Sequence, residues 1–181
     1  MKKDNIILVG MPASGKSTMG VILAKILGYS FIDADIVIQE KEGRKLSEII
    51  EQDGVEEFIA IENRINSGIV AQKTVIATGG SVVYGKEAMD HYKNIGRIVY
   101  LKVSMDELTK RLSDVRQRGV VMREGQSLVA LYNERSALYE QYADVTVDEK
   151  NLSLEEVLAE IIAELSRQKS ISPEAQATLL L

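Results

Sequence analysis

Residues Gly10 to Ser17 have the types and the spacing of a phosphate-binding loop. They read GMPASGKS, which matches the pattern G-x-x-x-x-G-K-S/T at every fixed position. Glycines let the backbone curve closely around phosphate groups with its N–H groups pointing inward. Lys16 can neutralise the β- and γ-phosphates, and the Ser17 hydroxyl can bind Mg²⁺. The motif therefore predicts a site for a nucleoside triphosphate and Mg²⁺, against the alternative of a chance glycine turn before a helix.

The nucleotide-binding residues expected from this loop share one short segment. They are Gly10, Ala13, Ser14, Gly15, Lys16, Ser17 and Thr18. With 181 residues the chain is too short for a multidomain motor, and it lacks the guanine-recognition pattern N-K-x-D. Nucleotide kinases and small-metabolite kinases are the classes that remain.

Two aspartates, Asp33 and Asp35, follow the second short apolar run of the chain. In open α/β sheets, ligands bind at the carboxyl ends of the strands. Asp33 can reach the Mg²⁺ shell there, and Asp35 can orient the hydroxyl of a phosphate acceptor. The alternative is a pair of solvated aspartates, with Asp35 capping the helix that follows.

The elements that must position these residues alternate along the chain. Short β-type runs are expected at 6–9, 30–32, 74–77, within 95–103 and at 143–147. Helical patterns are expected at 16–27, 35–42, 46–52, 56–71, 105–115, 127–142 and 154–167. Strands separated by helices pair in parallel through right-handed crossovers. The predicted fold class is α/β, a three-layer arrangement with a central parallel sheet of about five strands flanked by helices.

The amino-acid composition excludes several further classes of function. The chain has 22 Lys and Arg against 27 Asp and Glu, one histidine and no cysteine. Disulfides, thiol nucleophiles and Cys- or His-based zinc sites are therefore excluded. The net charge of −5 argues against a general nucleic-acid binder. We found no signal peptide and no membrane-spanning stretch, so a cytoplasmic protein is expected.

Further motifs follow in an order that resembles the shikimate kinase family, over about residues 5 to 168. The matching segments are Asp33-Ala34-Asp35, a partial match at 54–62, Thr78-Gly79-Gly80-Ser81, a lid motif at 118–121 and a late motif at 135–139. The resemblance implies a single P-loop kinase domain (1–168) with a lid at about 115–126. Residues 169–181 are expected to form a loosely held tail.

On the nucleotide side, the resemblance implies that Ser17 and Asp33 serve Mg²⁺ and that Arg111 stacks on adenine. The stretch 148–151 is expected near the same base. Arg118 would close over the transferring phosphoryl group and, with Lys16, neutralise its charge. Closure of a lid excludes water, which would otherwise compete as an acceptor.

On the acceptor side, the resemblance implies that Asp35 acts as base or positioner for the reacting hydroxyl. Gly79 and Gly80 would offer backbone N–H groups to the acceptor. Arg135 would bind the acceptor's carboxylate, and Glu62 would orient Arg135. Without the resemblance, Arg118 and Arg135 would be taken for solvated surface charges.

The chain departs from the family pattern around the acceptor. Ile59 stands where the family has an arginine that grips the carboxylate, and Ser81 replaces the third glycine. An aliphatic side chain cannot replace a guanidinium clamp. Arg64 is a poor substitute, because it lies about 140° round the helix from Ile59.

Three hypotheses follow from these residues. The first is a shikimate kinase that transfers the γ-phosphate of ATP to the 3-hydroxyl of shikimate, with the carboxylate held mainly by Arg135. The second is a sibling kinase acting on another hydroxy acid or amino acid, such as homoserine or gluconate. The third is a non-catalytic nucleotide-binding regulator. A monomer that binds no nucleic acid and no membrane is expected.

Overall fold

The strands form one parallel sheet in the order β2-β3-β1-β4-β5. We analysed a computed structural model that describes residues 3–113 and 120–167. The strands in this part of the chain are β1 (Asn5–Val9), β2 (Ser30–Asp33), β3 (Thr74–Ala77), β4 (Gly96–Lys102) and β5 (Val145–Asp148). All four neighbouring pairs run parallel. The predicted fold class and the number of strands are confirmed.

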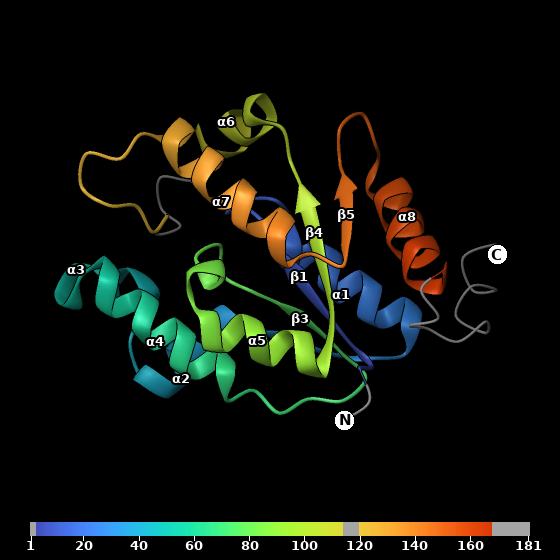
Figure 1. Cartoon of the computed structure of the whole chain (residues 1–181), viewed down its shortest axis with the longest axis horizontal. Coiled ribbons are helices and arrows are strands. Elements are labelled where there is room, and N and C mark those ends of the chain that lie inside the picture. The colour runs from blue at the N-terminus through green and yellow to red at the C-terminus, as the bar shows by residue number, and fades with distance from the viewer. Residues whose placement is uncertain (1–2, 114–119, 168–181) are drawn as a thin grey trace.

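Helices connect the strands and cover both faces of the sheet. They are α1 (Lys16–Leu27), α2 (Ala34–Glu42), α3 (Leu46–Asp53), α4 (Val55–Ser67), the short 3₁₀ helix η1 (Val82–Tyr84), α5 (Lys86–Ile95), α6 (Met105–Ser113), α7 (Leu128–Tyr142) and α8 (Leu154–Arg167). Figure 1 shows α5 and α7 in front of the sheet and α1 behind it. No helix within the described ranges is long and apolar enough to cross a bilayer.

The alternation of side chains along β1 explains why both faces of the sheet carry an apolar cluster. Ile6 and Leu8 belong to the cluster that α1 and α8 cover, while Ile7 and Val9 belong to the cluster beneath α5 and α7. Successive side chains of a strand point to opposite faces, so a strand that is apolar throughout must be covered twice. The central strand is therefore buried on both sides, and its carboxyl end is fixed at one edge of the sheet.

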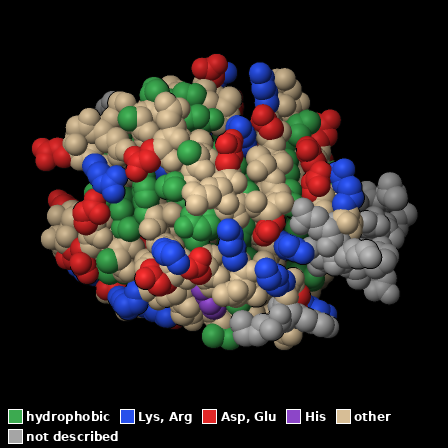
Figure 2. Space-filling model, in the orientation of Figure 1, with side chains coloured by type: hydrophobic (Ala, Val, Ile, Leu, Met, Phe, Trp, Pro, Cys, Tyr) green, Lys and Arg blue, Asp and Glu red, His purple; other side chains and the backbone are tan. Residues whose placement is uncertain are grey.

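A third apolar cluster holds α2, α3 and α4 together beside the sheet. Its buried members are Ile38 of α2, Ile49 of α3, Phe58, Ile61 and Ile65 of α4, and Val121 of the segment before α7. This group of helices lies beyond β2 and β3, at the left of Figure 1. Figure 2 shows acidic and basic side chains interspersed over the face that carries α5 and α7.

The structure differs from the sequence-based elements mainly between residues 55 and 95. The helix expected to run to Ala71 ends at Ser67, because the Gly68 N–H bonds back to Ile65 and closes the last turn. Helix α5 was not expected at all, since it is rich in polar residues. Its apolar members still recur with helical spacing, because Ala88, Met89, Tyr92 and Ile95 are the buried ones. The tail at 169–181 lies outside the described residues.

Candidate active site at the carboxyl ends of the strands

The phosphate loop joins the end of β1 to the start of α1. Gly10 adopts a φ of +152°, and a Cβ there would lie 2.7 Å from the Leu101 carbonyl oxygen, so only glycine fits. Gly15 caps α1 in the left-handed region with a φ of 85°. Ala13 also has a positive φ, of 64°, which is uncommon for a residue with a side chain. The loop is thus held in the curved shape that places N–H groups around an anion.

The Lys16 ammonium is folded back onto its own loop. Its Nζ donates to the carbonyl oxygens of Gly10 at 2.9 Å and Met11 at 2.8 Å, and to Ser14 Oγ at 3.3 Å. Burial lowers the pKa of Lys16 to about 8, while the charge of Asp35 opposes that shift. The ammonium therefore occupies the concave side of the loop, where a phosphate chain would meet it.

Ser17 and Asp33 lie together at the mouth of the loop. Ser17 Oγ donates to Asp33 Oδ2 at 2.7 Å, and the other carboxylate oxygen accepts from the Asp35 N–H at 3.0 Å. Asp33 is thus the N-cap of α2, the position that the sequence had suggested for Asp35. A hydroxyl and a carboxylate are oxygen ligands of the kind that Mg²⁺ prefers. The two residues assigned to the metal by sequence fit that ion.

Asp35 lies in the first turn of α2 and faces inward. Burial raises the pKa of its carboxyl group to about 6; the charge of Asp33 adds to the rise and Lys16 opposes it. A carboxylate with this pKa is ionised in most molecules at neutral pH. It is therefore poised to accept a hydrogen bond from a hydroxyl placed beside the phosphate loop.

Most of the predicted site residues line one cleft of about 160 Å³. Those predicted from the sequence are Ala13, Gly15, Lys16, Ser17, Thr18, Asp35, Glu62, Gly79, Gly80 and Arg135. The cleft is also lined by Pro12, Leu46, Phe58, Thr78, Ser81 and Val121. Leu46 could not be recognised as a site residue, because an apolar residue in a helix carries no functional signal of its own, whereas Val121 belongs to the predicted lid motif.

Glu62 lines the cleft from the middle of α4. Its side chain is buried, and neither carboxylate oxygen has a hydrogen-bond partner among the described residues, since the nearby Ser81 hydroxyl falls short of that geometry. Burial raises the pKa of Glu62 to about 8, Asp35 adds to the rise, and Ser81, Arg135 and Lys16 oppose it. Glu62 is therefore largely protonated at neutral pH.

Arg135 comes from α7 and is also buried. Its Nη2 donates to the Val121 carbonyl at 2.6 Å, its Nε donates to the Tyr84 hydroxyl at 3.4 Å, and its guanidinium lies 5.3 Å from the centre of the Tyr84 ring. The third nitrogen, Nη1, has no partner within the described ranges. This free N–H group beside Gly80 is available to an anionic ligand. The expected orientation of Arg135 by Glu62 is not seen as a direct contact.

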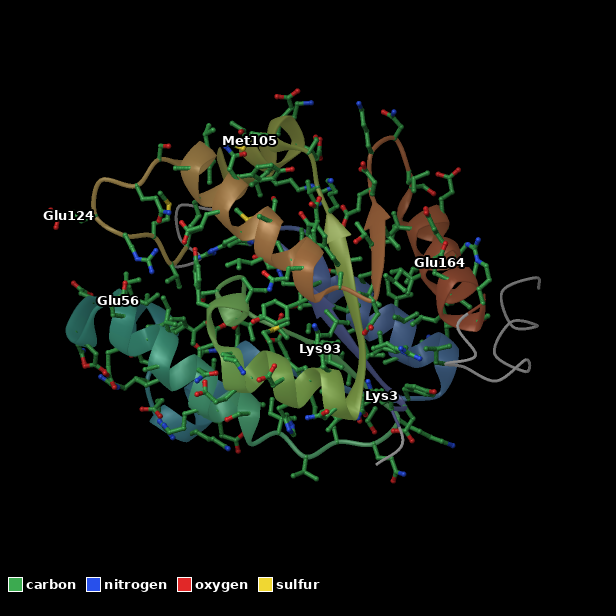
Figure 3. All side chains as sticks on the ribbon, viewed as in Figure 1. Lys3, Glu56, Lys93, Met105, Glu124 and Glu164 are labelled. Atoms are coloured by element: carbon green, nitrogen blue, oxygen red, sulfur yellow. The ribbon has the colours of Figure 1, made fainter. Side chains whose placement is uncertain are left out.

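Of the predicted lid at 115–126, the structure describes residues 120–126. They form an irregular segment, tied to α4 because Arg123 Nε donates to Glu56 Oε1 at 2.9 Å and to α7 because Arg123 Nη1 donates to Glu134 Oε1 at 3.2 Å. Figure 3 shows Glu124 at the outer end of this segment, on the same side of the molecule as Glu56. Arg118 lies outside the described residues, so its predicted role is untested.

Arg111 contacts the phosphate loop but does not line the cleft. Its Nη1 donates to Glu149 Oε2 at 3.0 Å and to the Ala13 carbonyl at 3.4 Å, and its Nε donates to Glu107 at 3.0 Å. The sequence placed Arg111 near the nucleotide, and its contact with the loop agrees with that position. Glu149 belongs to the stretch 148–151 that was expected near the same base, but its direct ion pair with Arg111 was not predicted.

The fold and this arrangement of a phosphate loop beside a charged cleft define a P-loop kinase that acts on a small molecule. The shikimate kinase family model matches residues 12–166. The shikimate kinase of Thermodesulfovibrio yellowstonii is 37% identical over 166 residues, which cover 90% of this chain and 95% of that protein. The chain therefore belongs to the shikimate kinase family.

Two further comparisons agree. The shikimate kinase of a Sulfurihydrogenibium species is 33% identical over 165 residues, 91% of this chain and 99% of that protein. The solved structure of shikimate kinase from Acinetobacter baumannii in complex with shikimate superimposes with a TM-score of 0.79 at 29% identity, covering 93% of this chain and 96% of that one. A gluconokinase from Sinorhizobium meliloti, at 21% identity and a TM-score of 0.52, shares the fold alone.

Proposed function

We propose that the protein is a shikimate kinase, which transfers the γ-phosphoryl group of ATP to the 3-hydroxyl of shikimate. The observation that carries the proposal is the shared cleft. It places the concave face of the phosphate loop, the Asp35 carboxylate and the unpartnered Nη1 of Arg135 in one cavity. A small acid with a hydroxyl group matches these three features, because it can face phosphate, base and guanidinium at once.

In the proposed reaction, the acceptor oxygen attacks the γ-phosphorus and the bond to the β–γ bridging oxygen breaks, releasing ADP. Asp35 accepts the hydrogen bond of the attacking hydroxyl and takes its proton as the new bond forms. Lys16 exchanges its loop carbonyls for phosphate oxygens. Such a transfer needs positioning and charge neutralisation more than covalent help. Arg135 orients the acceptor by its carboxylate, with Gly79 and Gly80 offering backbone N–H groups.

Mg²⁺ belongs to the same proposal. Ser17 and Asp33 would hold it, Asp33 through a water, and the ion would supply positive charge beside the β- and γ-phosphates. The hydrogen bond of 2.7 Å between their oxygens supports this position, because it brings a hydroxyl and a carboxylate together at the mouth of the phosphate loop. Arg118 is proposed to close over the phosphoryl group from the lid.

A second acceptor class is favoured by one observation. Glu62 has no hydrogen-bond partner in the part of the chain that the structure describes, and Ile59 one turn earlier is aliphatic. A buried carboxyl group without a partner suits an acceptor that brings its own ammonium group, such as homoserine. Gluconate represents the hydroxy acids that lack this amine. The alternative is thus a sibling kinase of the same fold.

An ADP-release assay with Mg²⁺-ATP tests the proposal. Shikimate, homoserine and gluconate are compared on the wild type, on Asp35→Asn and on the exposed control Asp106→Asn. We expect turnover of shikimate, a loss of about 10²- to 10⁴-fold in kcat for Asp35→Asn, and no change for the control. Turnover of another acceptor alone would assign the sibling kinase. Tight ATP binding without turnover of any acceptor would indicate a regulator and contradict the proposal.

A further inference from the structure

Only neutral groups hold the Arg135 guanidinium in the described part of the chain. Arg135 is 1% exposed. Its Nη2 donates to the Val121 carbonyl oxygen at 2.6 Å, and its Nε donates to the Tyr84 hydroxyl at 3.4 Å. A buried cation without an opposite charge is oriented by whichever polar groups surround it. The direction in which Nη1 points therefore depends on Val121 and Tyr84.

Tyr84 is fixed to the glycine turn that lines the cleft. It ends η1, and its backbone N–H donates to the Ser81 carbonyl oxygen at 3.0 Å. In the same turn, the Gly80 carbonyl oxygen accepts from the Tyr139 hydroxyl at 2.5 Å, which ties the turn to α7, the helix that carries Arg135. The Tyr84 side chain can thus serve as a fixed support for the guanidinium that comes from α7.

Two guanidinium groups lie against the Tyr84 ring. The Cζ of Arg135 lies 5.3 Å from the ring centre, and the Cζ of Arg123 lies 5.4 Å from it. A guanidinium within about 6 Å of a ring centre is attracted by the π-electrons of that ring. Arg123 is itself anchored, because it pairs with Glu56 at 2.9 Å and with Glu134 at 3.2 Å. The Tyr84 ring is therefore held by a cation that has a fixed place of its own.

Ile59 borders the same space as these groups. A small hollow beside the cleft is lined by Val55, Ile59, Tyr84, Val121, Arg123, Gln126 and Arg135. The family pattern has an arginine at the position of Ile59. With an aliphatic side chain there, Arg135 is the single guanidinium that lines the acceptor cleft within the described ranges. How precisely Arg135 is held then decides how well a carboxylate is bound.

We propose that Tyr84 is a positioning residue for acceptor binding: its ring and hydroxyl hold the Arg135 guanidinium so that Nη1 faces the carboxylate of the acceptor. This inference deepens the proposed function and rests on it for the acid that Arg135 binds. Tyr84 does not line the cleft, so it acts through Arg135 and does not touch the acceptor. Removal of the ring should let the guanidinium turn and weaken its grip on the carboxylate, while the phosphate loop is unaffected.

Steady-state kinetics with shikimate and with its methyl ester test the proposal, because the ester lacks the negative charge that Arg135 binds. We expect Tyr84→Leu to raise KM for shikimate by about tenfold or more, with KM for ATP unchanged and kcat within about threefold of the wild type. KM for the ester should change by less than about twofold. Tyr84→Phe keeps the ring and loses one long hydrogen bond, so its KM for shikimate should lie closer to the wild type.

Tyr142→Leu is the matched control. The Tyr142 ring also carries a cation, since Lys93 Nζ lies 4.9 Å from its centre, but neither residue lines the cleft. Its loss should leave KM for shikimate, for the ester and for ATP as in the wild type.

Nitrogen-15 NMR reports the position of Arg135 without any acceptor, and it therefore separates this inference from the proposed function. The Nε–H signal of Arg135, assigned by its loss in Arg135→Lys, should exchange slowly with water in the wild type. Tyr84→Leu should shift this signal and speed its exchange by at least about tenfold, because the ring and the hydroxyl are both gone. Tyr142→Leu should leave the signal in place.

An Arg135 signal that Tyr84→Leu leaves unmoved would overturn the inference, whichever acceptor the enzyme uses. Equal rises in KM for shikimate and for its ester would also overturn it, because they would show a general distortion of the cleft. If the wild type turns over no shikimate while the Arg135 signal still depends on Tyr84, the proposed function fails and the positioning of Arg135 by Tyr84 stands.

Discussion

Glu62 and Arg135 face the same buried cleft, yet no hydrogen bond joins them. Both Glu62 oxygens and Arg135 Nη1 lack a partner among the described residues. Groups of this kind are costly to bury alone, because each has lost its water. The cleft therefore offers two carboxyl oxygens and one guanidinium N–H group that have no hydrogen-bond partner. A phosphate acceptor that bonds to both residues gains most from binding there.

Replacing Ile59 by arginine should strengthen acceptor binding. The new guanidinium would lie three residues before Glu62 on the same side of α4 and would add a second cation for a carboxylate. We expect KM for shikimate to fall by about tenfold or more, with KM for ATP unchanged. Ile59→Leu is the control for packing. An Ile59→Arg variant with an unchanged KM for shikimate would mean that Arg135 alone binds the carboxylate.

The pH profile of kcat/KM for ATP should be bell-shaped. The reaction needs ionised Asp35, whose pKa is about 6, so the rate rises with pH through that value. It also needs charged Lys16, whose pKa is about 8, so the rate falls above that value. Bound phosphates raise the pKa of Lys16, and the alkaline limb of kcat at saturating ATP should therefore lie at higher pH. Identical alkaline limbs in the two profiles would refute the role of Lys16.

Glu62→Gln should change how stability depends on pH. The pKa of Glu62 is about 8 in the folded protein, above its ordinary value of 4.5, so the native state binds the extra proton between these values. The stabilisation is complete below the lower value and is lost as pH rises toward the higher one. The wild type should lose up to about 1.4 kcal/mol per pH unit relative to Glu62→Gln.

Urea unfolding at several pH values measures this difference. The exposed residue Glu57 lies on the same helix, and Glu57→Gln should give a curve parallel to that of the wild type. If Glu62→Gln also runs parallel to the wild type, Glu62 is ionised in the folded protein, and its pKa is not raised.

Gly79→Ala should damage the acceptor cleft. The added Cβ would lie 2.2 Å from Glu62 Oε1 and 2.9 Å from Asp35 Oδ1, so both carboxyl groups must move. We expect a rise in KM for the acceptor of at least about tenfold, with ATP binding retained. Gly68→Ala is the matched control, because its nearest neighbour would be 3.6 Å away. Normal acceptor kinetics in Gly79→Ala would show that these carboxyl groups do not position the acceptor.

The sequence predicts the nucleotide half of the site well, because that half depends on local order. The phosphate loop, α1 and Asp33 are contiguous or follow a strand end, and each was expected where the structure has it. Direct contacts between individual side chains of distant segments could not be foreseen, even where both segments were expected near the nucleotide. Residues 111 and 149 are 38 apart, and their ion pair follows from the packing of α6 beside the turn after β5.

The acceptor half of the site shows the same limit of prediction from the sequence. That Glu62 and Arg135 belong to one cleft could be inferred from the family pattern, whereas their lack of a direct bond depends on side-chain positions. Helix α5 was missed because the helical spacing of its buried residues is masked by polar neighbours. Both the missing bond between Glu62 and Arg135 and the presence of α5 depend on which side chains are buried in the folded chain. A single sequence does not show this.

The strand order β2-β3-β1-β4-β5 puts the segments after β2 and β3 on one side of β1 and those after β4 and β5 on the other, so the proposed acceptor and nucleotide sites lie on opposite sides of β1. Ile59 and Ser81, which depart from the family pattern, both lie on the side of β2 and β3. Substitutions there leave the phosphate loop, Arg111 and Glu149 untouched. Evolution can thus change the acceptor while the phosphoryl donor stays the same. One scaffold of this kind can give rise to a lineage of kinases with different acceptor specificities.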